Sequence, residues 1–360
     1  GRFSLLPPVG ESLPGGAGLG PRGPRHVLLL PSVHCLLGGH HRCCGSDPPW
    51  QAEGQESPGR PVSRRRQNEV IFDRKGESLM KSKKLIITAA LCGAGTMKSQ
   101  TPYVPVTPEE IAADAVACAK AGASVIHIHV RDDEGKNTME TERFCHVVNL
   151  VREELAKANL DAVLNLTSSG SKFSEDMRLA HLPILKPEMC SYDPGSMNWA
   201  NSYIFANSPS FLERLGTLCQ KEAIKPECEV FDGGMMGNIE YYMKKGFLSS
   251  PIHYQFVLGV SGGMPGNADS LAYLLPKMLP GSTWSITGIG RDHLPCMLLG
   301  LAEGCDGLRV GLEDNIFLEK GVLATNAQLV ERACKLGELA GRTIATAADA
   351  REILGLTKHI

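Results

Sequence analysis

From Met80 onward, short apolar stretches alternate with segments whose apolar residues recur every three to four positions. The first pattern is typical of buried strands and the second of amphipathic helices. We expect strands at residues 85–91, 124–130, 162–168, 184–192, 227–231, 253–259, 283–288 and 308–313. We expect helices at residues 107–122, 140–156, 175–181, 209–223, 238–245, 269–279, 295–303 and 326–340.

Strict alternation of eight strands and eight helices predicts an α/β protein of the (β/α)8 or TIM-barrel class. The alternative is an open doubly wound sheet, which requires a glycine-rich dinucleotide turn after the first strand. The segment Cys92-Gly93-Ala94-Gly95-Thr96 fits that turn poorly. In a barrel the active site lies where the strands end, so we look for function there.

Residues 1–79 differ from the rest of the chain. They are rich in Gly, Pro and Arg, including Arg64-Arg65-Arg66, and show no sustained period. All twelve methionines lie at position 80 or beyond, and Met80 directly precedes the first periodic segment. We expect residues 1–79 to be a non-native or disordered leader and residues 80–360 to form the catalytic barrel. A targeting peptide is the alternative.

Composition narrows the functional classes. The net charge of −2 at pH 7 gives no argument for binding nucleic acid or an anionic membrane. No apolar run is long enough to cross a bilayer. The twelve cysteines are scattered singly apart from Cys43-Cys44, which indicates reduced thiols. We therefore expect a cytoplasmic protein.

The segment Val125–Asp132 carries the first candidate chemistry. Side chains alternate along a strand, so His127 and His129 point to one side while apolar residues cover the other. Two imidazoles at the end of a barrel strand provide half of a metal site. The alternative is that neighbouring groups satisfy both histidines, and a third ligand is needed to decide.

The last expected strand supplies a third ligand. Its inward positions are Arg309, Gly311 and Glu313. Strands eight and two both neighbour strand one in a closed barrel, so Glu313 is expected to approach both histidines. Two imidazoles and one carboxylate suit a catalytic Zn²⁺, although Fe²⁺ or another divalent ion uses the same set. A structural Arg309–Glu313 ion pair is the alternative.

Other acids and a histidine also face the expected barrel interior. Glu227 and Glu229 alternate inward on strand five, and His253 has a comparable place on strand six. Because these strands lie far around the ring from strand two, we expect them to be too distant to act as ligands.

Further polar residues lie at other strand ends. Strand three ends with Thr167 and Gly170, and strand four with Ser191 and Asp193. Hydroxyls there are suited to binding a carboxylate or carbonyl oxygen, although loop capping is an equal alternative. Glycine-rich turns after strands six and seven, with Gly262, Gly263 and Arg291, suggest a phosphate site.

These segments together resemble the β-keto acid cleavage enzymes. The similarity runs from about Lys84 to Leu356 and includes LIITAALCGA, VTPEEIAADA, AGASVIHIHVRD, LKPEM, HYQFVLGVSGGMPG, GIGR, RVGLEDN and NAQLV. The resemblance implies a Zn²⁺-dependent barrel that converts a β-keto acid and acetyl-CoA into acetoacetate and a new acyl-CoA. It also implies that the protein is a homo-oligomer with four subunits.

The resemblance implies roles for individual residues. His127, His129 and Glu313 match the metal ligands, and Asp314 with Arg309 matches the acid–base dyad. The positions that contact the keto acid are matched by Thr167, Gly170, Ser191 and Asp193.

One position departs from the family pattern. Relatives that act on the amino substrate carry a glutamate in the loop after strand one, where this chain has Gly95. Losing that carboxylate removes the obvious partner of an ammonium group. We therefore expect a neutral β-keto acid as substrate. There are two alternative functions. One is a metal-dependent aldolase or decarboxylase that uses no CoA, and the other is a non-catalytic barrel that a metal ion stabilises.

Overall fold

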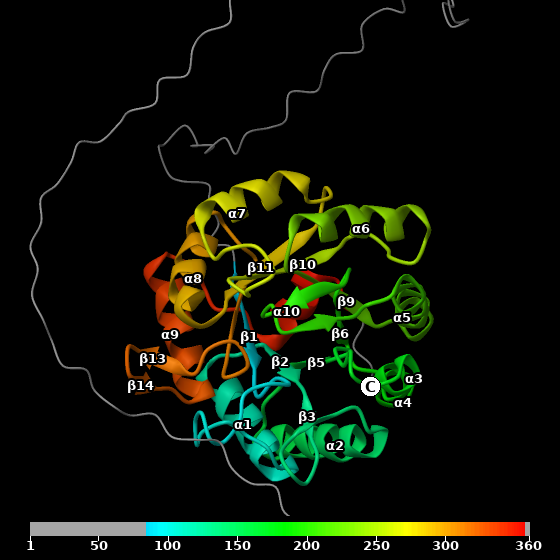
Figure 1. Cartoon of the computed structure of the whole chain (residues 1–360). Coiled ribbons are helices and arrows are strands. Elements are labelled where there is room, and N and C mark those ends of the chain that lie inside the picture. The colour runs from blue at the N-terminus through cyan, green and yellow to red at the C-terminus, as the bar shows by residue number, and fades with distance from the viewer. Residues whose placement is uncertain (1–83, 357–360) are drawn as a thin grey trace, which may run out of the picture. The chain divides into compact units, whose positions relative to one another are not determined.

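A closed barrel of parallel strands forms the centre of this computed structural model, which describes residues 84–356 (Figure 1). The expected leader 1–79 lies outside the described residues. The barrel strands are β1 (Ile86–Ala90), β2 (Val125–Ile128), β5 (Val163–Leu166), β6 (Met189–Tyr192), β9 (Lys225–Val230), β10 (His253–Leu258), β11 (Thr283–Gly288) and β12 (Gly307–Val310). Their order around the ring is β1-β12-β11-β10-β9-β6-β5-β2, which confirms the expected (β/α)8 fold.

Helices surround the barrel, as Figure 1 shows. They are α1 (Pro108–Ala121), α2 (Thr141–Lys157), α3 (Glu175–Ala180), α4 (Leu182–Leu185), α5 (Pro209–Glu222), α6 (Gly233–Lys244), α7 (Ala268–Leu274), α8 (His293–Ala302), α9 (Asn326–Leu339) and α10 (Ala347–Leu354), with 3₁₀ turns η1 (Leu275–Lys277) and η2 (Gly290–Asp292). Within the described residues, every helix is too short or too polar to span a membrane.

Three small hairpins decorate the loops. They are β3–β4 (Val130–Arg131 and Asn137–Thr138), β7–β8 (Met197–Trp199 and Tyr203–Phe205) and β13–β14 (Phe317–Glu319 and Val322–Leu323). Each follows a barrel strand at the end where we expected chemistry. None of them was expected from the sequence.

Local sequence explains the first helix. The side chain of Thr107 accepts a hydrogen bond from Glu110 N at 3.2 Å, and the Glu110 carboxylate accepts one from Thr107 N at 3.3 Å. Pro108 occupies the first turn, where its missing N–H costs nothing. Gly122 ends the helix with a φ of 113°, a conformation that favours glycine. The expected helix 107–122 is confirmed.

Two expected elements begin five residues away from their expected start. The expected strand 184–192 begins only at Met189, because Leu182–Leu185 forms the short helix α4 with Pro183 in its first turn. Helix α6 begins at Gly233, five residues before the expected start. The Asp232 side chain caps this helix by accepting from Gly234 N at 2.8 Å.

Helix α10 closes the barrel at the end opposite to the site. Ala350 and Leu354 pack with the first residues of four strands, Ile86, Val125, Val163 and Met189. This helix was not expected, because eight helices already complete the repeat. Its apolar face seals the barrel floor.

The last barrel strand ends earlier than expected. β12 stops at Val310, and Gly311 has a φ of 141°. A Cβ at Gly311 would lie 2.0 Å from Ala90 O, so only glycine fits against β1. Asp314 N and Asn315 N both donate to Gly311 O, at 3.1 and 3.0 Å. Glu313 therefore lies on a tight turn rather than on the strand itself.

Candidate metal centre and active site

Two histidines and one glutamate meet at the open end of the barrel. His127 belongs to β2, His129 follows it, and Glu313 lies on the turn after β12. His127 Nε2 is 3.6 Å from Glu313 Oε2, and His129 Nε2 is 3.3 Å from Glu313 Oε1. The two imidazole centroids are 5.2 Å apart. The structure thus brings together the three predicted ligands.

These separations fit a divalent ion. Two ligands that each lie about 2.1 Å from a tetrahedral Zn²⁺ ion are about 3.4 Å apart. The nitrogen–oxygen distances of 3.3 and 3.6 Å are close to that value. Glu313 Oε2 is also buried without a hydrogen-bond partner, which a coordinated cation would satisfy.

The loop after β1 is shaped to admit Glu313. A Cβ at Gly93 would lie 2.5 Å from Glu313 Cγ, and Gly93 has a φ of 59°. The glycine lets the glutamate side chain pass directly over the end of β1. The segment that we compared with a dinucleotide turn therefore serves close packing against a candidate ligand.

One expectation about distance was wrong. His127, Glu227 and Glu229 each offer a ligand atom within 4.8 Å of the others, although β9 lies far around the ring from β2. An eight-stranded barrel is narrow, so inward side chains from opposite strands meet across its centre. Glu227 and Glu229 are therefore neighbours of the site, which the sequence argument missed.

Charge at the ligand cluster is set by burial and by Arg309. Burial lowers the pKa of His127 to about 3, so its ring is neutral at pH 7. Burial opposes the charge of Glu313, but the Arg309 guanidinium and the two imidazoles hold the pKa of that carboxyl well below its usual range. Neutral imidazole and ionised carboxylate are the forms that bind a metal ion.

Arg309 binds three carboxylates inside the barrel. Its Nε lies 2.9 Å from Asp314 Oδ2, its Nη2 lies 2.8 Å from Glu313 Oε1, and its Nη1 lies 3.3 Å from Glu229 Oε1. The guanidinium is 2% exposed, so these contacts replace its hydration. Burial alone would lower the pKa of Arg309, but the three carboxylates raise it well above its usual range. The predicted Arg309–Asp314 pair is present.

Asp314 also has a hydroxyl neighbour. Thr287 Oγ1 donates to Asp314 Oδ2 at 3.2 Å. Burial raises the pKa of Asp314, although the Arg309 charge acts in the opposite direction. A buried carboxylate with a raised pKa is a better proton acceptor than a solvated one.

The predicted keto-acid residues lie at the ends of β5 and β6. Ser191 Oγ accepts from Ser168 N at 2.8 Å, and Thr167 Oγ1 accepts from Ser169 N at 2.9 Å. Both hydroxyls keep their own protons for donation. Ser169 Oγ donates to Asp193 Oδ2 at 2.5 Å, while Asp193 Oδ1 is buried without a partner. Ser169 is a member of this cluster that we had not singled out.

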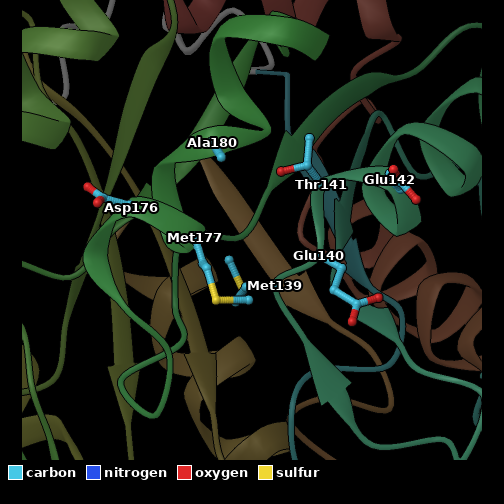
Figure 2. A pocket seen from close by; sticks show the side chains of 7 residues that line it. All are labelled: Met139, Glu140, Thr141, Glu142, Asp176, Met177 and Ala180. Atoms are coloured by element: carbon cyan, nitrogen blue, oxygen red, sulfur yellow. The ribbon is translucent and has the colours of Figure 1, made fainter.

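Gly170 and a pocket at Met139 lie next to that cluster. A Cβ at Gly170 would lie 2.8 Å from Met139 Cγ, so the loop packs tightly on Met139. Met139 also lines a separate cavity of about 410 Å³ between α2 and α3 (Figure 2). Its other lining residues are Glu140, Thr141, Glu142, Asp176, Met177 and Ala180. The candidate metal ligands do not line this cavity, so we keep the active site at the strand ends.

The predicted phosphate residues have a mixed outcome. A Cβ at Gly262 would lie 1.9 Å from Asn198 O, and one at Gly263 would lie 2.8 Å from Phe231 O. Gly263 N already donates to Val260 O at 2.9 Å. These glycines are thus explained by close packing. The Arg291 side chain is 94% exposed, and its Nε lies 3.6 Å from Asp292 Oδ1.

A buried arginine fixes the loops after β1 and β2. Arg131 Nη2 donates to Cys92 O at 2.8 Å and to Thr96 O at 2.9 Å, while its Nη1 donates to Gly135 O at 3.0 Å. Arg131 follows the strand that carries His127. In the sequence, a charged residue at the end of an apolar run was the signal that could have marked it.

A second buried arginine, Arg178, forms hydrogen bonds with the loops that follow β5 and β6. Arg178 Nε donates to Ser168 O at 2.7 Å, and its Nη2 donates to Asn207 Oδ1 at 2.6 Å. Its guanidinium also lies 3.6 Å from the centroid of the Phe211 ring. No pattern in the sequence marked Arg178, because it lies on a short helix with other charged residues.

The chain is similar to known proteins over most of its described length. A family model described as beta-keto acid cleavage enzyme matches residues 84–356. A 3-keto-5-aminohexanoate cleavage enzyme from Fusobacterium nucleatum is 40% identical over 276 residues, 76% of this chain and 99% of that protein. A 3-dehydrocarnitine:acetyl-CoA trimethylamine transferase from Rhizobium meliloti is 34% identical over 302 residues, 78% of this chain and 99% of that protein.

A solved structure supports the fold. The binary complex of ObcA with oxaloacetate matches with a TM-score of 0.62 at 23% identity, covering 71% of this chain and 68% of that chain. At that identity the likeness concerns architecture alone. The family match and the two relatives confirm the resemblance seen in the sequence. The chain belongs to the β-keto acid cleavage enzyme family.

Proposed function

We propose that this protein is an acyltransferase that cleaves a β-keto acid in the presence of acetyl-CoA. The CH₂–COO⁻ part of the keto acid joins the acetyl group as acetoacetate, and the remaining acyl group leaves on CoA. Family membership supports this reaction, as does one relative named for 3-keto acid cleavage and another named for a transfer with acetyl-CoA. The observation that carries the proposal is the meeting of His127, His129 and Glu313 beside the Arg309–Asp314 pair.

The ligand chemistry favours Zn²⁺ in this site, held by His127, His129 and Glu313, although Fe²⁺ or another divalent ion uses the same ligands. A divalent ion bound there supplies Lewis-acid polarisation of the ketone. Family membership and the donor separations support a metal centre.

Asp314 is the group we assign to proton transfer. In our proposal its carboxylate accepts a proton from the CH₂ group of the keto acid, which makes that carbon a nucleophile toward the carbonyl carbon of acetyl-CoA. The two contacts from Arg309 and the one from Thr287 fix the carboxylate in place. Fixing the base before the reaction removes the entropy cost of aligning it.

The strand ends of β5 and β6 are suited to holding the keto acid. Thr167 and Ser191 can each donate a hydroxyl hydrogen bond to a substrate oxygen, and Gly170 leaves the loop close to Met139. We assign Asp193 to the same pocket because its Oδ1 is buried and unpartnered. For the CoA phosphates we retain Gly262, Gly263 and the exposed Arg291 as the proposed contact region.

We propose a neutral β-keto acid as the preferred substrate. A Cβ at Gly95 would have no neighbour within 4 Å, so space exists for a longer side chain at this position. This chain places no carboxylate there to pair with an ammonium group. The relatives named above are named for substrates with nitrogen groups, so our proposed substrate class differs from theirs.

We further propose that the protein acts in the cytoplasm as a homo-oligomer, a tetramer by family resemblance. Several cysteines of the described residues, such as Cys92, Cys118 and Cys228, are free thiols, which suits a reducing compartment. Small-molecule substrates are its proposed partners, without nucleic acid or membrane. The division into a leader at 1–79 and a barrel at 80–360 stays a prediction.

The test is a panel of β-keto acids offered to purified protein with and without acetyl-CoA. Our proposal requires acetoacetate only when both substrates are present, and loss of product in the Asp314→Asn variant. Product without acetyl-CoA would favour the aldolase or decarboxylase alternative. A metal-loaded protein inactive on the whole panel would favour the non-catalytic alternative.

A further inference from the structure

His127 lies between two side chains that approach it from opposite sides. The barrel order places β2 between β1 and β5. Glu313 comes over the end of β1 and faces His127 Nε2 at 3.6 Å. On the other side, Asn165 of β5 is in register with His127. The two ring nitrogens therefore have different surroundings, and Glu313 accounts for only one of them.

Three buried polar atoms on this second side have no hydrogen-bond partner. They are His127 Nδ1, Asn165 Oδ1 and Glu227 Oε1. An unsatisfied buried polar atom destabilises the folded protein, so such atoms are normally paired. Asn165 Oδ1 accepts hydrogen bonds only, and a protonated Nδ1 donates only. These two atoms are complementary.

Glu227 decides which way the Asn165 amide points. Asn165 Nδ2 donates to Glu227 Oε2 at 2.5 Å. A carboxylate oxygen accepts this hydrogen bond, so the NH₂ group of Asn165 faces Glu227. The Asn165 carbonyl oxygen is then left for the remaining neighbour.

We propose that Glu227 and Asn165 form a positioning relay that sets the tautomer of His127. In this relay Asn165 Oδ1 accepts the Nδ1–H of His127, which leaves the Nε2 lone pair facing Glu313 and a metal ion. The inference rests on the metal centre of the proposed function. Groups that accept the second N–H of a ligating histidine orient the ring and strengthen its binding.

The relay also explains why Glu227 lies near His127 without being needed as a ligand. His127, Glu227 and Glu229 offer atoms within 4.8 Å of one another, as a metal site would. However, Glu227 Oε2 is already engaged by Asn165, and Glu229 Oε1 is engaged by Arg309. The relay gives Glu227 a role beside the ion that His127, His129 and Glu313 hold.

The experiment measures Zn²⁺ affinity of the full chain by competition with a chromophoric chelator, a readout independent of activity. Asn165→Leu removes the acceptor with little change in volume. Glu227→Gln keeps the volume but lets the neighbouring amide point either way. The matched control is Asp114→Asn, because Asp114 is a half-buried carboxylate that also accepts from an asparagine amide, that of Asn326.

The relay predicts that Asn165→Leu weakens Zn²⁺ binding about 10–100-fold, the range for loss of such partners. Glu227→Gln should fall between this variant and the wild type, and Asp114→Asn should stay within about twofold of the wild type. Wild-type affinity in both site variants would overturn the relay, as would an equal loss in Asp114→Asn. A wild-type protein that binds no divalent ion would instead overturn the metal centre of the proposed function.

A second measurement reads the tautomer directly and covers the case in which Asn165→Leu fails to fold. A long-range proton–nitrogen NMR spectrum of ¹⁵N-histidine-labelled, Zn²⁺-loaded protein shows which nitrogen of each ring carries the proton. The relay predicts Nδ1–H at His127 in the wild type and a weakened or shifted Nδ1–H signal in Glu227→Gln. A proton on Nε2, or an unchanged signal in the variant, would contradict it.

Discussion

Arg309 holds Asp314 through two parallel contacts, with Nε 2.9 Å from Oδ2 and Nη2 3.3 Å from Oδ1. Both groups are buried, so the carboxylate cannot turn away to find water. The same guanidinium reaches Glu313, a candidate metal ligand, at 2.8 Å. The proposed base and the proposed metal centre therefore share one cation.

Asp314→Asn should abolish most of the activity while leaving the metal bound. The amide cannot accept the proton of the keto acid's CH₂ group, and general-base catalysis contributes about 10²–10⁴-fold in rate. We expect kcat for acetoacetate formation to fall by about that factor, measured beside metal content per chain. A variant that keeps its metal and loses less than about tenfold in kcat would exclude Asp314 as the base.

Arg309→Met should destabilise the fold more than most substitutions. It leaves the buried carboxylates of Glu229, Glu313 and Asp314 without their cation. Removing one partner of a buried ion pair costs about 3–5 kcal/mol in the free energy of unfolding, which urea denaturation measures. Arg309→Lys is the control, because it keeps the positive charge but loses the planar guanidinium that contacts several carboxylates at once. Equal stability of the wild type and Arg309→Met would contradict the account.

Acid should destabilise the protein through buried histidines outside the metal centre. Burial lowers the pKa of His181 to about 3, its ring stacks on Phe144 at 3.9 Å, and its Nε2 lies 3.1 Å from Thr167 O. The unfolded value is about 6.5, so between these pH values the unfolded chain binds more protons. The contribution of neutral His181 is complete above about pH 6.5 and is lost as the pH falls toward 3.

His181→Leu tests that dependence. Well below pH 6.5 one such group contributes a slope of about 1.4 kcal/mol per pH unit to the free energy of unfolding. The variant should therefore lose stability less steeply than the wild type when urea unfolding is compared at pH 7.5 and pH 5. Parallel curves for the two proteins would show that His181 is not buried in its neutral form.

Gly95→Glu should move substrate preference toward an ammonium-bearing keto acid. A Cβ there meets nothing within 4 Å, so the side chain fits without displacing a neighbour. A hydrogen bond to a charged group is worth about 1.5–3 kcal/mol, or about 10–100-fold in kcat/KM. We expect that gain for 3-keto-5-aminohexanoate relative to an uncharged 3-keto acid, with Gly95→Gln as the uncharged control. A wild type that already prefers the amino substrate would contradict our proposal.

Most of the barrel could be predicted because its signals are local. Thr107, Pro108 and Gly122 mark both ends of α1, and the eight apolar strands are separated by periodic helices. The exceptions have specific causes. Pro183 begins the short helix α4 within an apolar run that resembles a strand, and Gly233 begins α6 although glycine is a poor helix former.

The sequence predicted which residues form the candidate site, but it predicted their arrangement in space only in part. Strand alternation placed His127 and His129 on one face, and neighbouring strands brought Glu313 near them. The turn that carries Glu313 depends on Gly311 lying against Ala90 O, a contact across strands that no local pattern encodes. Glu227 approaches His127 because the barrel is narrow. The order of the strands around the ring, which the sequence predicts, gives no information about that width.

The most direct test of the metal centre is an anomalous-difference map recorded at the zinc absorption edge from crystals of Zn²⁺-loaded protein. Our account predicts one strong peak within about 2.0–2.2 Å of His127 Nε2, His129 Nε2 and a Glu313 oxygen. A peak between His127, Glu227 and Glu229 instead, or no peak near His129 and Glu313, would contradict it.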